Sequence, residues 1–223
     1  MRIAYIENFQ GYYAANQTIE PTTLMGFSQF YSDPAGTRSK NYSIAIDKAL
    51  SRFFAYGISY VDRNLELEAV RNGTEIVDTL STKERIADAY FQYIPNVQVS
   101  MSMGLGWDRR STAEIVSESD SLYVDLYSVP FVVSLFADNG ASFTVKQTYF
   151  KQRFSSLQSP DRQKQNTWIT SVIAGYRFPG HFGSLEFGLD NLFDESDEFV
   201  NYDATTLAFY PGRLWFAAIN INI

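Results

Sequence analysis

Few side chains in this chain could do covalent chemistry. Its 223 residues include one histidine, His181, and no cysteine. A hydrolase needs a base such as histidine beside a nucleophilic hydroxyl group, but His181 lies in a short turn at 179–183, where we expect a solvated side chain. The lack of cysteine excludes disulfides and cysteine-ligated metal or iron–sulfur centres. The sequence therefore predicts a protein that is not an enzyme and that holds no cofactor or metal.

Charged side chains gather in two regions that could bind ions. Carboxylates at 190–198 could hold Ca²⁺, but they lack the spacing of an EF-hand loop, and we expect a solvated loop there. Basic residues at 108–110 and 151–164 could pair with phosphate groups, and ordinary loop solubility explains them nearly as well. The net charge of −7 argues against nucleic acid as a partner, because binding to a phosphate backbone needs clustered lysine and arginine. The residues concerned are Asp190, Asp194, Glu195, Asp197 and Glu198 in the first region, and Arg109, Arg110, Lys151, Arg153, Arg162 and Lys164 in the second.

Apolar and polar residues alternate with period two along most of the chain, which is the pattern of β-strands that have one apolar face. The longest unbroken stretch, 97–107, places these apolar residues on one face: Val97, Val99, Met101, Met103, Leu105 and Trp107. Its length, about eleven residues, is what a tilted strand needs to cross a bilayer. Shorter stretches predict further strands near 2–16, 23–31, 42–47, 54–60, 87–93, 127–135, 143–149, 168–178, 185–189 and 215–223.

The connections between these stretches come in two lengths that alternate along the chain. The turns near 47–52, 95, 139 and 179 are short, whereas the segments 32–41, 62–83, 108–121, 152–166 and 194–211 are long and hydrophilic. In an up-and-down antiparallel sheet this alternation places every long loop at one end. Outer-membrane barrels have short periplasmic turns and long external loops in this way, whereas a soluble sandwich has no reason to sort its loops.

These patterns predict an all-β fold, namely an antiparallel up-and-down transmembrane β-barrel of the bacterial outer membrane. We expect about 10–12 strands in one barrel domain, 1–223. Aromatic residues form 16% of the chain and gather near the expected strand ends, as interfacial girdles do; they are Phe54, Tyr93, Trp107, Tyr127, Trp168, Tyr176 and Phe178. A soluble ligand-binding barrel stays open as an alternative, because periodicity alone does not say which face is inside. In the membrane barrel the polar face lines the lumen, and the candidate lining residues are Asp88, Gln92, Lys146, Arg177, Glu186 and Asn220.

Two short motifs near the end of the chain carry a resemblance to a known family. The run Asn191-Leu192-Phe193-Asp194 follows an alternating stretch, and Pro211-Gly212-Arg213 precedes the last one. This arrangement resembles the C-terminal end of TonB-dependent receptor barrels, in which such runs close the penultimate strand and open the last. More loosely, 19–30 and 62–66 are similar to barrel regions that follow tetratricopeptide repeats in large outer-membrane proteins. The last residue, Ile223, stands where the family usually has an aromatic residue.

The resemblance implies a function and a set of partners. It implies transport or docking of a solute through the lumen, insertion by the barrel-assembly machinery, contact with outer-membrane lipid and lipopolysaccharide, and coupling to the TonB system through an N-terminal region that precedes these residues. The assembly machinery would read the terminal strand, through Trp215, Ile219, Ile221 and Ile223. Because Met1 to Phe9 shows no signal peptide, we expect the chain to be the C-terminal part of a larger barrel. A barrel that anchors a periplasmic repeat domain or serves as its export pore is an alternative, and a barrel hydrolase that uses His181 is another.

Overall fold

One large β-sheet and two small hairpins make up the computed structural model, which describes residues 1–10, 23–24, 26–28, 33, 36–70, 77–112, 121–156, 163–196, 198–200, 207–209 and 212–221. No helix within these ranges is long and apolar enough to cross a membrane. The elements are β1 (Arg2–Phe9), β2 (Thr23–Leu24), β3 (Phe27–Ser28), β4 (Arg38–Ala49), β5 (Phe54–Val70), β6 (Val77–Asn96), β7 (Val99–Thr112), β8 (Ser121–Phe136), β9 (Ala141–Ser156), β10 (Gln163–Arg177), the 3₁₀ turn η1 (Pro179–His181), β11 (Gly183–Asp190), β12 (Glu198–Val200), β13 (Leu207–Phe209) and β14 (Leu214–Ile221).

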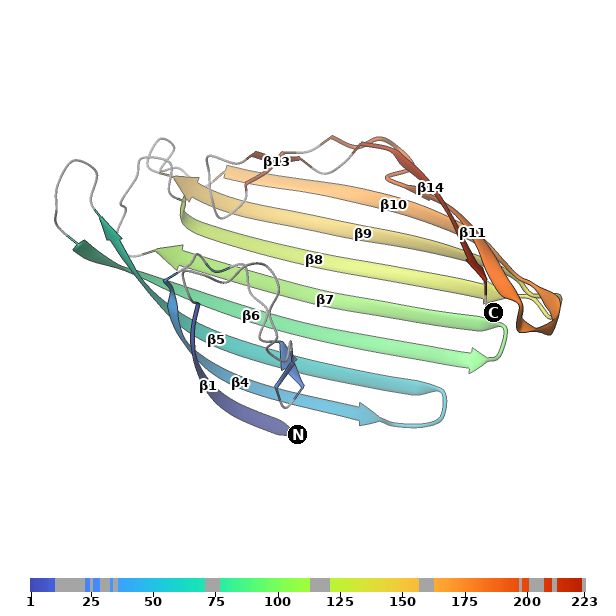
Figure 1. The fold of residues 1–223 in the computed structure, drawn as a ribbon, viewed down its shortest axis with the longest axis horizontal. Helices are drawn as coiled ribbons and strands as arrows, with labels where there is room; N and C mark the ends of the chain where they lie inside the picture. The colour runs from blue at the N-terminus through green and yellow to red at the C-terminus, as the bar shows by residue number, and fades with distance from the viewer. Residues whose placement is uncertain are drawn as a thin grey trace.

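The main sheet has ten antiparallel strands in the order β1-β4-β5-β6-β7-β8-β9-β10-β11-β14. Each strand therefore pairs with its neighbours along the chain, apart from the two small hairpins β2–β3 and β12–β13, which stand outside the sheet. The sheet curls so that β11 and β14 turn over one side of it and β1 over the other (Figure 1). It is open: β1 and β14 are its two edges, and no strand pairing in the described ranges joins them. The prediction of an all-β, up-and-down antiparallel fold is confirmed at this level.

The connections are sorted by length as predicted. Short turns join β4 to β5, β6 to β7, β8 to β9 and β10 to β11 at one end of the sheet (Figure 1), and longer stretches of sequence separate β5 from β6, β7 from β8 and β9 from β10 at the other end. One predicted strand is wrong. Of its described residues, 23–24 and 27–28 form a separate hairpin outside the main sheet, and β1 pairs directly with β4. The main sheet therefore has ten strands, within the predicted 10–12.

Several predicted loops prove to be strand. The polar segment 62–83 largely belongs to β5 and β6, at their long-loop ends. These strands are 17 and 20 residues long. They pair without interruption from Phe54 opposite Tyr93 to Val70 opposite Val77. Charged side chains on both faces hide the alternation there. Pairing with the neighbouring strand keeps these residues extended, because opposite charges on adjacent strands stabilise a sheet. The guanidinium group of Arg85 lies 3.2 Å from the Asp62 carboxylate of the neighbouring strand.

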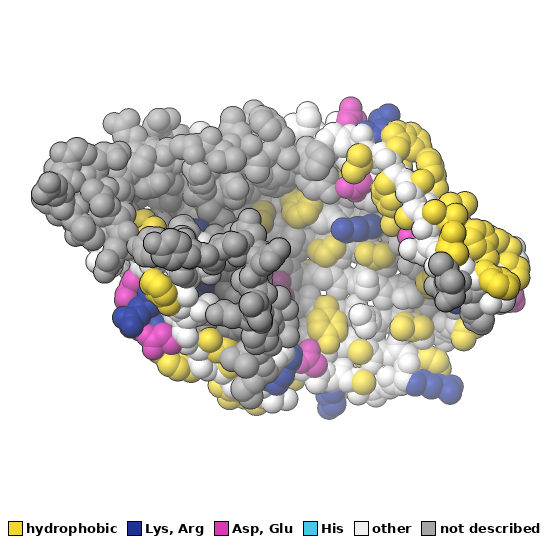
Figure 2. Space-filling model, viewed as in Figure 1, with side chains coloured by type: hydrophobic (Ala, Val, Ile, Leu, Met, Phe, Trp, Pro, Cys, Tyr) yellow, Lys and Arg dark blue, Asp and Glu magenta, His cyan; other side chains and the backbone are white. Residues whose placement is uncertain are grey.

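The two faces of the sheet differ in chemistry. On β4 the side chains of Tyr42, Ile44 and Ile46 are exposed, whereas Asn41 and Ser43 are buried. The strand register carries this division across the sheet: large exposed apolar side chains share the convex face, whereas the concave face, which Figure 2 shows hollowed, mixes polar side chains with apolar ones such as Val61, Val124 and Phe154. A soluble protein buries most of its large apolar residues, whereas many of them are exposed on the convex face here. Exposed large apolar residues of the convex face include Ile3, Tyr5, Ile58, Met103, Leu105, Phe131, Leu135, Phe143, Phe187, Ile219 and Ile221.

Candidate functional site

The concave face carries a buried network of charges at the long-loop end. Arg63 of β5 is only 1% exposed, and its guanidinium group donates to the carboxylates of Glu84 and Asp33 and, over 3.2 Å, to Oδ1 of Asn41. Asn41 and Glu84 belong to the strands on either side, and Asp33 belongs to the connection between β1 and β4. Because a buried charge is costly unless it is paired, Arg63 ties that connection to the inside of the sheet.

Glu84 is the acidic partner whose protonation is most affected by this environment. Burial raises the pKa of the Glu84 carboxyl group, and the attraction of Arg63 offsets this only in part. Glu84 lies opposite Arg110 of β7. It is nearer the long-loop end of the sheet than the exposed apolar residues of β7 and β8, such as Leu105 and Phe131. The network therefore holds a carboxylate that is more easily protonated than an exposed glutamate.

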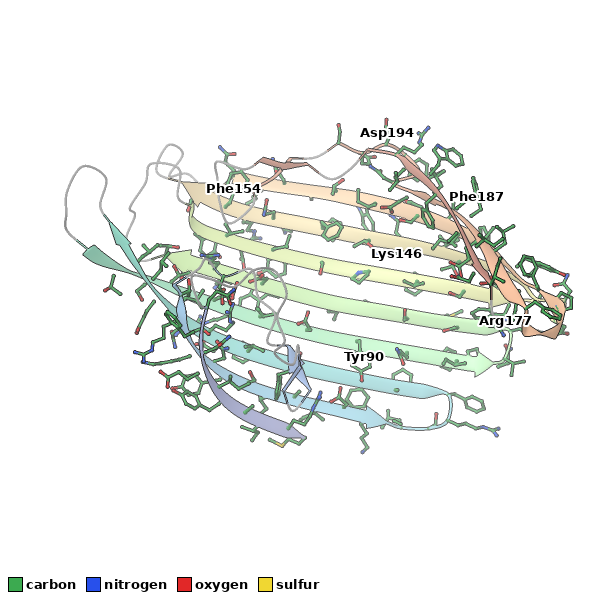
Figure 3. All side chains as sticks on the ribbon, viewed as in Figure 1. Tyr90, Lys146, Phe154, Arg177, Phe187 and Asp194 are labelled. Carbon is green, nitrogen blue, oxygen red and sulfur yellow. The ribbon has the colours of Figure 1, made fainter. Side chains whose placement is uncertain are left out.

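A second polar cluster lies under the β2–β3 hairpin. Arg2 donates to Asp47 of β4 and to the backbone carbonyl of Gly26 over 3.2 Å, while the Tyr90 hydroxyl donates to the same Asp47 over 3.0 Å. The Arg2 guanidinium also lies 5.4 Å from the ring centre of Phe27, which is 4% exposed. A cavity of about 230 Å³ between the hairpin and the sheet is lined by these residues. The hairpin thus covers the concave side of β4, β5 and β6, with Tyr90 projecting from the sheet (Figure 3).

The close approach of Tyr90 to Asp47 depends on a glycine between them. A Cβ atom at Gly57, the residue of β5 that pairs with both, would lie 2.2 Å from the Tyr90 ring and 2.7 Å from the Asp47 carboxylate. No side chain fits there without displacing one of them. Gly57 therefore leaves the space in which the Tyr90 hydroxyl reaches Asp47.

All six predicted lumen residues lie on the concave face by strand register, but they do not converge on one site. Asp88 and Gln92 are on β6, and Lys146 stands near the middle of β9 (Figure 3). The other three, Arg177, Glu186 and Asn220, lie near the short-turn end on β10, β11 and β14. Arg177 and Glu186 line a cavity of about 500 Å³ there. The six candidates are therefore spread over the concave face, where Asp88 lines one hollow and Arg177 and Glu186 line another.

The predicted Asn191–Asp194 motif forms a tight turn at the end of β11. Asn191 and Asp194 both have positive φ, of 51° and 58°. The buried Asn191 side chain accepts from the backbone N–H of Glu195 at 2.9 Å and donates to its carbonyl at 2.8 Å. Asp194 then accepts from the backbone N–H of Arg213 at 2.7 Å, and the backbone of Gly212 lies against the same carboxylate. The two motifs thus meet, and together they hold the start of β14 against the end of β11.

We expect Asn191→Gly to lower the free energy of unfolding by about 1–2 kcal/mol, because it removes two hydrogen bonds of a buried side chain while glycine still accepts the positive φ. Urea unfolding of the full chain in detergent micelles measures this loss. Glu195→Ala is the matched control, since Glu195 bonds to Asn191 only through its backbone. An equal loss in both variants would show that the Asn191 side chain has no special part in the turn.

The predicted terminal strand is present as β14, whose described side chains are all exposed. Trp215, Ile219 and Ile221 point to the convex face, and Phe187 of β11 packs on Trp215 with ring centres 5.6 Å apart. Leu192 and Phe193 lie in the motif turn, with Phe193 65% exposed. Pro211 and Ile223 lie outside the described residues.

The convex face carries a cluster that the alternation pattern did not single out. Asp125 of β8 is fully buried and accepts from Trp107 Nε1 at 2.6 Å, from Arg109 at 3.1 and 3.2 Å, and from the hydroxyls of Tyr123 and Tyr127 at 2.9 and 3.3 Å. The alternation of Tyr123, Asp125 and Tyr127 on one strand face is the sequence signal that could have marked this carboxylate.

The aromatic residues that we expected at strand ends occupy two different places. Trp107, Tyr127 and Trp168 lie well inside their strands, because β7, β8 and β10 continue beyond them with polar residues. Tyr149 and Trp168 stack across β9 and β10 with ring centres 4.8 Å apart. These residues form an aromatic row across the convex face, and the charged residues begin on its long-loop side. Phe54, Tyr93, Tyr176 and Phe178 lie near the short-turn end as predicted.

The remaining candidates for chemistry give no site in the described part of the chain. No group of three or more histidine or acidic side chains there could hold a metal ion. Asp190 hydrogen-bonds to the Ser171 hydroxyl, and Asp194 caps Arg213, as above. Asp197 and Arg162, and the side chains of His181 and Glu198, lie outside the described residues.

Comparison of the chain with protein-family models, with curated proteins and with solved structures gives no match. The fold and its two faces therefore define its class: an open, up-and-down antiparallel β-sheet whose convex face exposes many large apolar side chains and whose concave face mixes polar and apolar side chains.

Proposed function

We propose that this chain forms part of the wall of an outer-membrane β-barrel whose polar lumen transports or docks a solute. The observation that carries the proposal is the exposed apolar convex face. Lipid is the surrounding in which such a face is favourable, because apolar surface exposed to water costs about 25 cal/mol per Å². Transmembrane barrels alternate apolar residues toward lipid with polar residues toward the lumen in this way.

The open edges of the sheet support a wall that more strands complete. Unpaired backbone groups at an edge cost several kcal/mol each in lipid, so β1 and β14 would need further strands on either side in a membrane. The concave face presents both acidic and basic side chains to a solute, and neither sign of charge dominates among the candidate lining residues. The acidic ones are Asp88 and Glu186, and the basic ones are Lys146 and Arg177. We propose on this basis a passage for polar solutes.

A receptor of TonB-dependent type is the particular barrel that we propose. Support comes from the contact between its two motif segments. The Asp194 carboxylate, in the turn after β11, accepts a hydrogen bond from the backbone N–H of Arg213, just before β14. That contact gives the motif a structural role, because it fixes the start of the last strand against the end of β11. Energised uptake through the TonB system, and insertion by the barrel-assembly machinery, are parts of the same proposal.

The native tryptophans test the membrane proposal without any mutation. Trp107, Trp168 and Trp215 are the only tryptophans of the chain, and all three lie on the convex face. The chain is folded into phosphatidylcholine vesicles with and without brominated acyl chains, which quench fluorescence on contact. We expect most of the tryptophan emission to be lost in the brominated vesicles, because these side chains touch lipid.

Two results would contradict the proposal. One is emission that brominated lipid leaves unchanged while aqueous iodide quenches it. The other is a monodisperse, folded monomer in buffer without detergent, which would favour the soluble ligand-binding barrel. The choice between uptake and anchoring depends on the reading frame upstream of Met1: encoded helical repeats would favour an anchor or export pore, and an encoded plug domain with a TonB box would favour uptake.

A further inference from the structure

A row of positively charged side chains crosses the convex face directly beyond the aromatic row. The strand register places Arg85 opposite Arg109, Arg109 opposite Asp125, Asp125 opposite Arg153, and Arg153 opposite Lys164. Lys83 and Lys151 flank this row on β6 and β9, on the same face. We call these six cations the basic band: Lys83, Arg85, Arg109, Lys151, Arg153 and Lys164.

The basic band is an exception to the charge of the chain as a whole. The chain has a net charge of −7, yet the described convex positions of β6 to β10 hold these six cations and a single carboxylate, Asp125. That carboxylate is already occupied by five hydrogen bonds from its neighbours. On β5, Asp62 pairs with Arg85 and Lys83 at 3.2 and 3.7 Å. No ion pair in the described ranges involves Lys151, Arg153 or Lys164, and Nε of Arg153 is shielded from water without a hydrogen-bond partner.

Arg109 is held in a fixed orientation within this band. Two of its nitrogen atoms bond to Asp125, and its guanidinium carbon lies 5.1 Å from the Trp107 ring centre and 5.3 Å from that of Tyr123. A cation fixed in this way binds an anion with little further loss of side-chain entropy. Its side chain is 35% exposed, so the group remains open to a ligand on the lipid side.

We propose that the basic band binds the phosphate groups of lipopolysaccharide in the external leaflet, an inference that rests on the proposed membrane function. Three features fit this ligand. The band lies at the long-loop end, where outer-membrane barrels face the outside. It begins where the apolar band ends, which is the level of lipid headgroups. It also spans four strand spacings, about 19 Å, so that one headgroup with two phosphates can contact several cations, and guanidinium groups bind phosphate with two parallel hydrogen bonds.

The test compares two charge-matched variants of the full chain in detergent micelles. Arg153→Gln with Lys164→Gln removes two cations from the band, and Lys48→Gln with Arg52→Gln removes two cations at the short-turn end, where both residues are exposed. Each protein is titrated with diphosphorylated lipid A and with dephosphorylated lipid A. The readout is the fluorescence change of Trp107 and Trp168, which adjoin the band. Circular dichroism confirms that each variant keeps its β content.

We expect saturable binding of diphosphorylated lipid A that weakens about 10- to 100-fold in the Arg153 and Lys164 variant, because two charge-assisted contacts are lost. The control variant should bind like the native chain, and dephosphorylated lipid A should bind far more weakly. Equal affinity for both lipids, equal weakening in both variants, or competition by millimolar inorganic phosphate alone would overturn the inference. If tryptophan is quenched by brominated lipid but lipid A does not bind, the membrane proposal stands and the basic band fails; loss of both would mean that the membrane proposal itself has failed.

Discussion

Replacing Arg63 with methionine is expected to lower the free energy of unfolding by about 3–5 kcal/mol, the usual cost of removing one partner from a buried ion pair. Methionine fills a similar volume, so the loss comes from charge and not from a cavity. It leaves Glu84, Asp33 and Asn41 without their shared donor inside the sheet. Urea unfolding of the full chain in detergent micelles at neutral pH, followed by circular dichroism, measures the change.

The pH dependence of this variant identifies Glu84 as the cause. A carboxyl group whose folded-state pKa is raised favours the folded state when protonated, so its contribution is present at low pH and is lost as the pH rises through that raised pKa. Burial already raises the pKa of Glu84 beside Arg63, and removing the arginine raises it further. The stability loss should therefore shrink on acidification. Adding Glu84→Gln to Arg63→Met should restore most of the stability at neutral pH; if the double variant is no more stable than the single one, the network is not the source of the loss.

Replacing Met103 with arginine is expected to lower the free energy of unfolding from lipid vesicles by about 2–4 kcal/mol, the cost of an arginine on the lipid face near the bilayer midplane. Met103 is 38% exposed on the convex face and lies opposite Phe131, in the middle of the apolar band. The same substitution on a surface that faces water would change stability by less than about 0.5 kcal/mol. The size of the effect therefore distinguishes lipid from water at one position.

Ser102→Arg is the control for that experiment. Ser102 adjoins Met103 on the same strand but points to the concave face, opposite Gln92 and Val132. An arginine there enters the polar lumen and should cost much less than at Met103. If the Ser102 variant were instead the less stable of the two, lipid or a packed core would have to lie on the concave side.

Much of the fold follows from local patterns in the sequence. Period-two alternation at 97–107 predicts β7 and its faces, and the alternation of short and long connections predicts the up-and-down order that the strand pairing shows. The turn motifs at Asn191 and Asp194 predict where β11 ends. The six candidate lumen residues share the concave face, because a strand face is fixed by parity once the register is known.

Other features depend on contacts between segments and leave no local signal. The outer halves of β5 and β6 are charged on both faces, so alternation fails there, and only cross-strand pairs such as Asp62 with Arg85 keep them extended. The stretch at 23–31 alternates like a strand, yet part of it folds over the concave face through Arg2 and Phe27. The Asp125 cluster joins β7 and β8, so the stretch around Asp125 shows only part of it. The same holds for the basic band.

Spin labels on β7 test the central claim most directly. The chain contains no cysteine, so single cysteines at 100–103 and at 105 can be labelled one at a time in the full chain folded into vesicles. Labels at 101, 103 and 105 should collide with oxygen, which partitions into lipid, and those at 100 and 102 should collide with a water-soluble nickel complex. A period-two alternation with this phase is the predicted result. Equal access of the nickel complex to all five positions, or an alternation with the opposite phase, would contradict an apolar face toward lipid and a polar face toward a wet lumen.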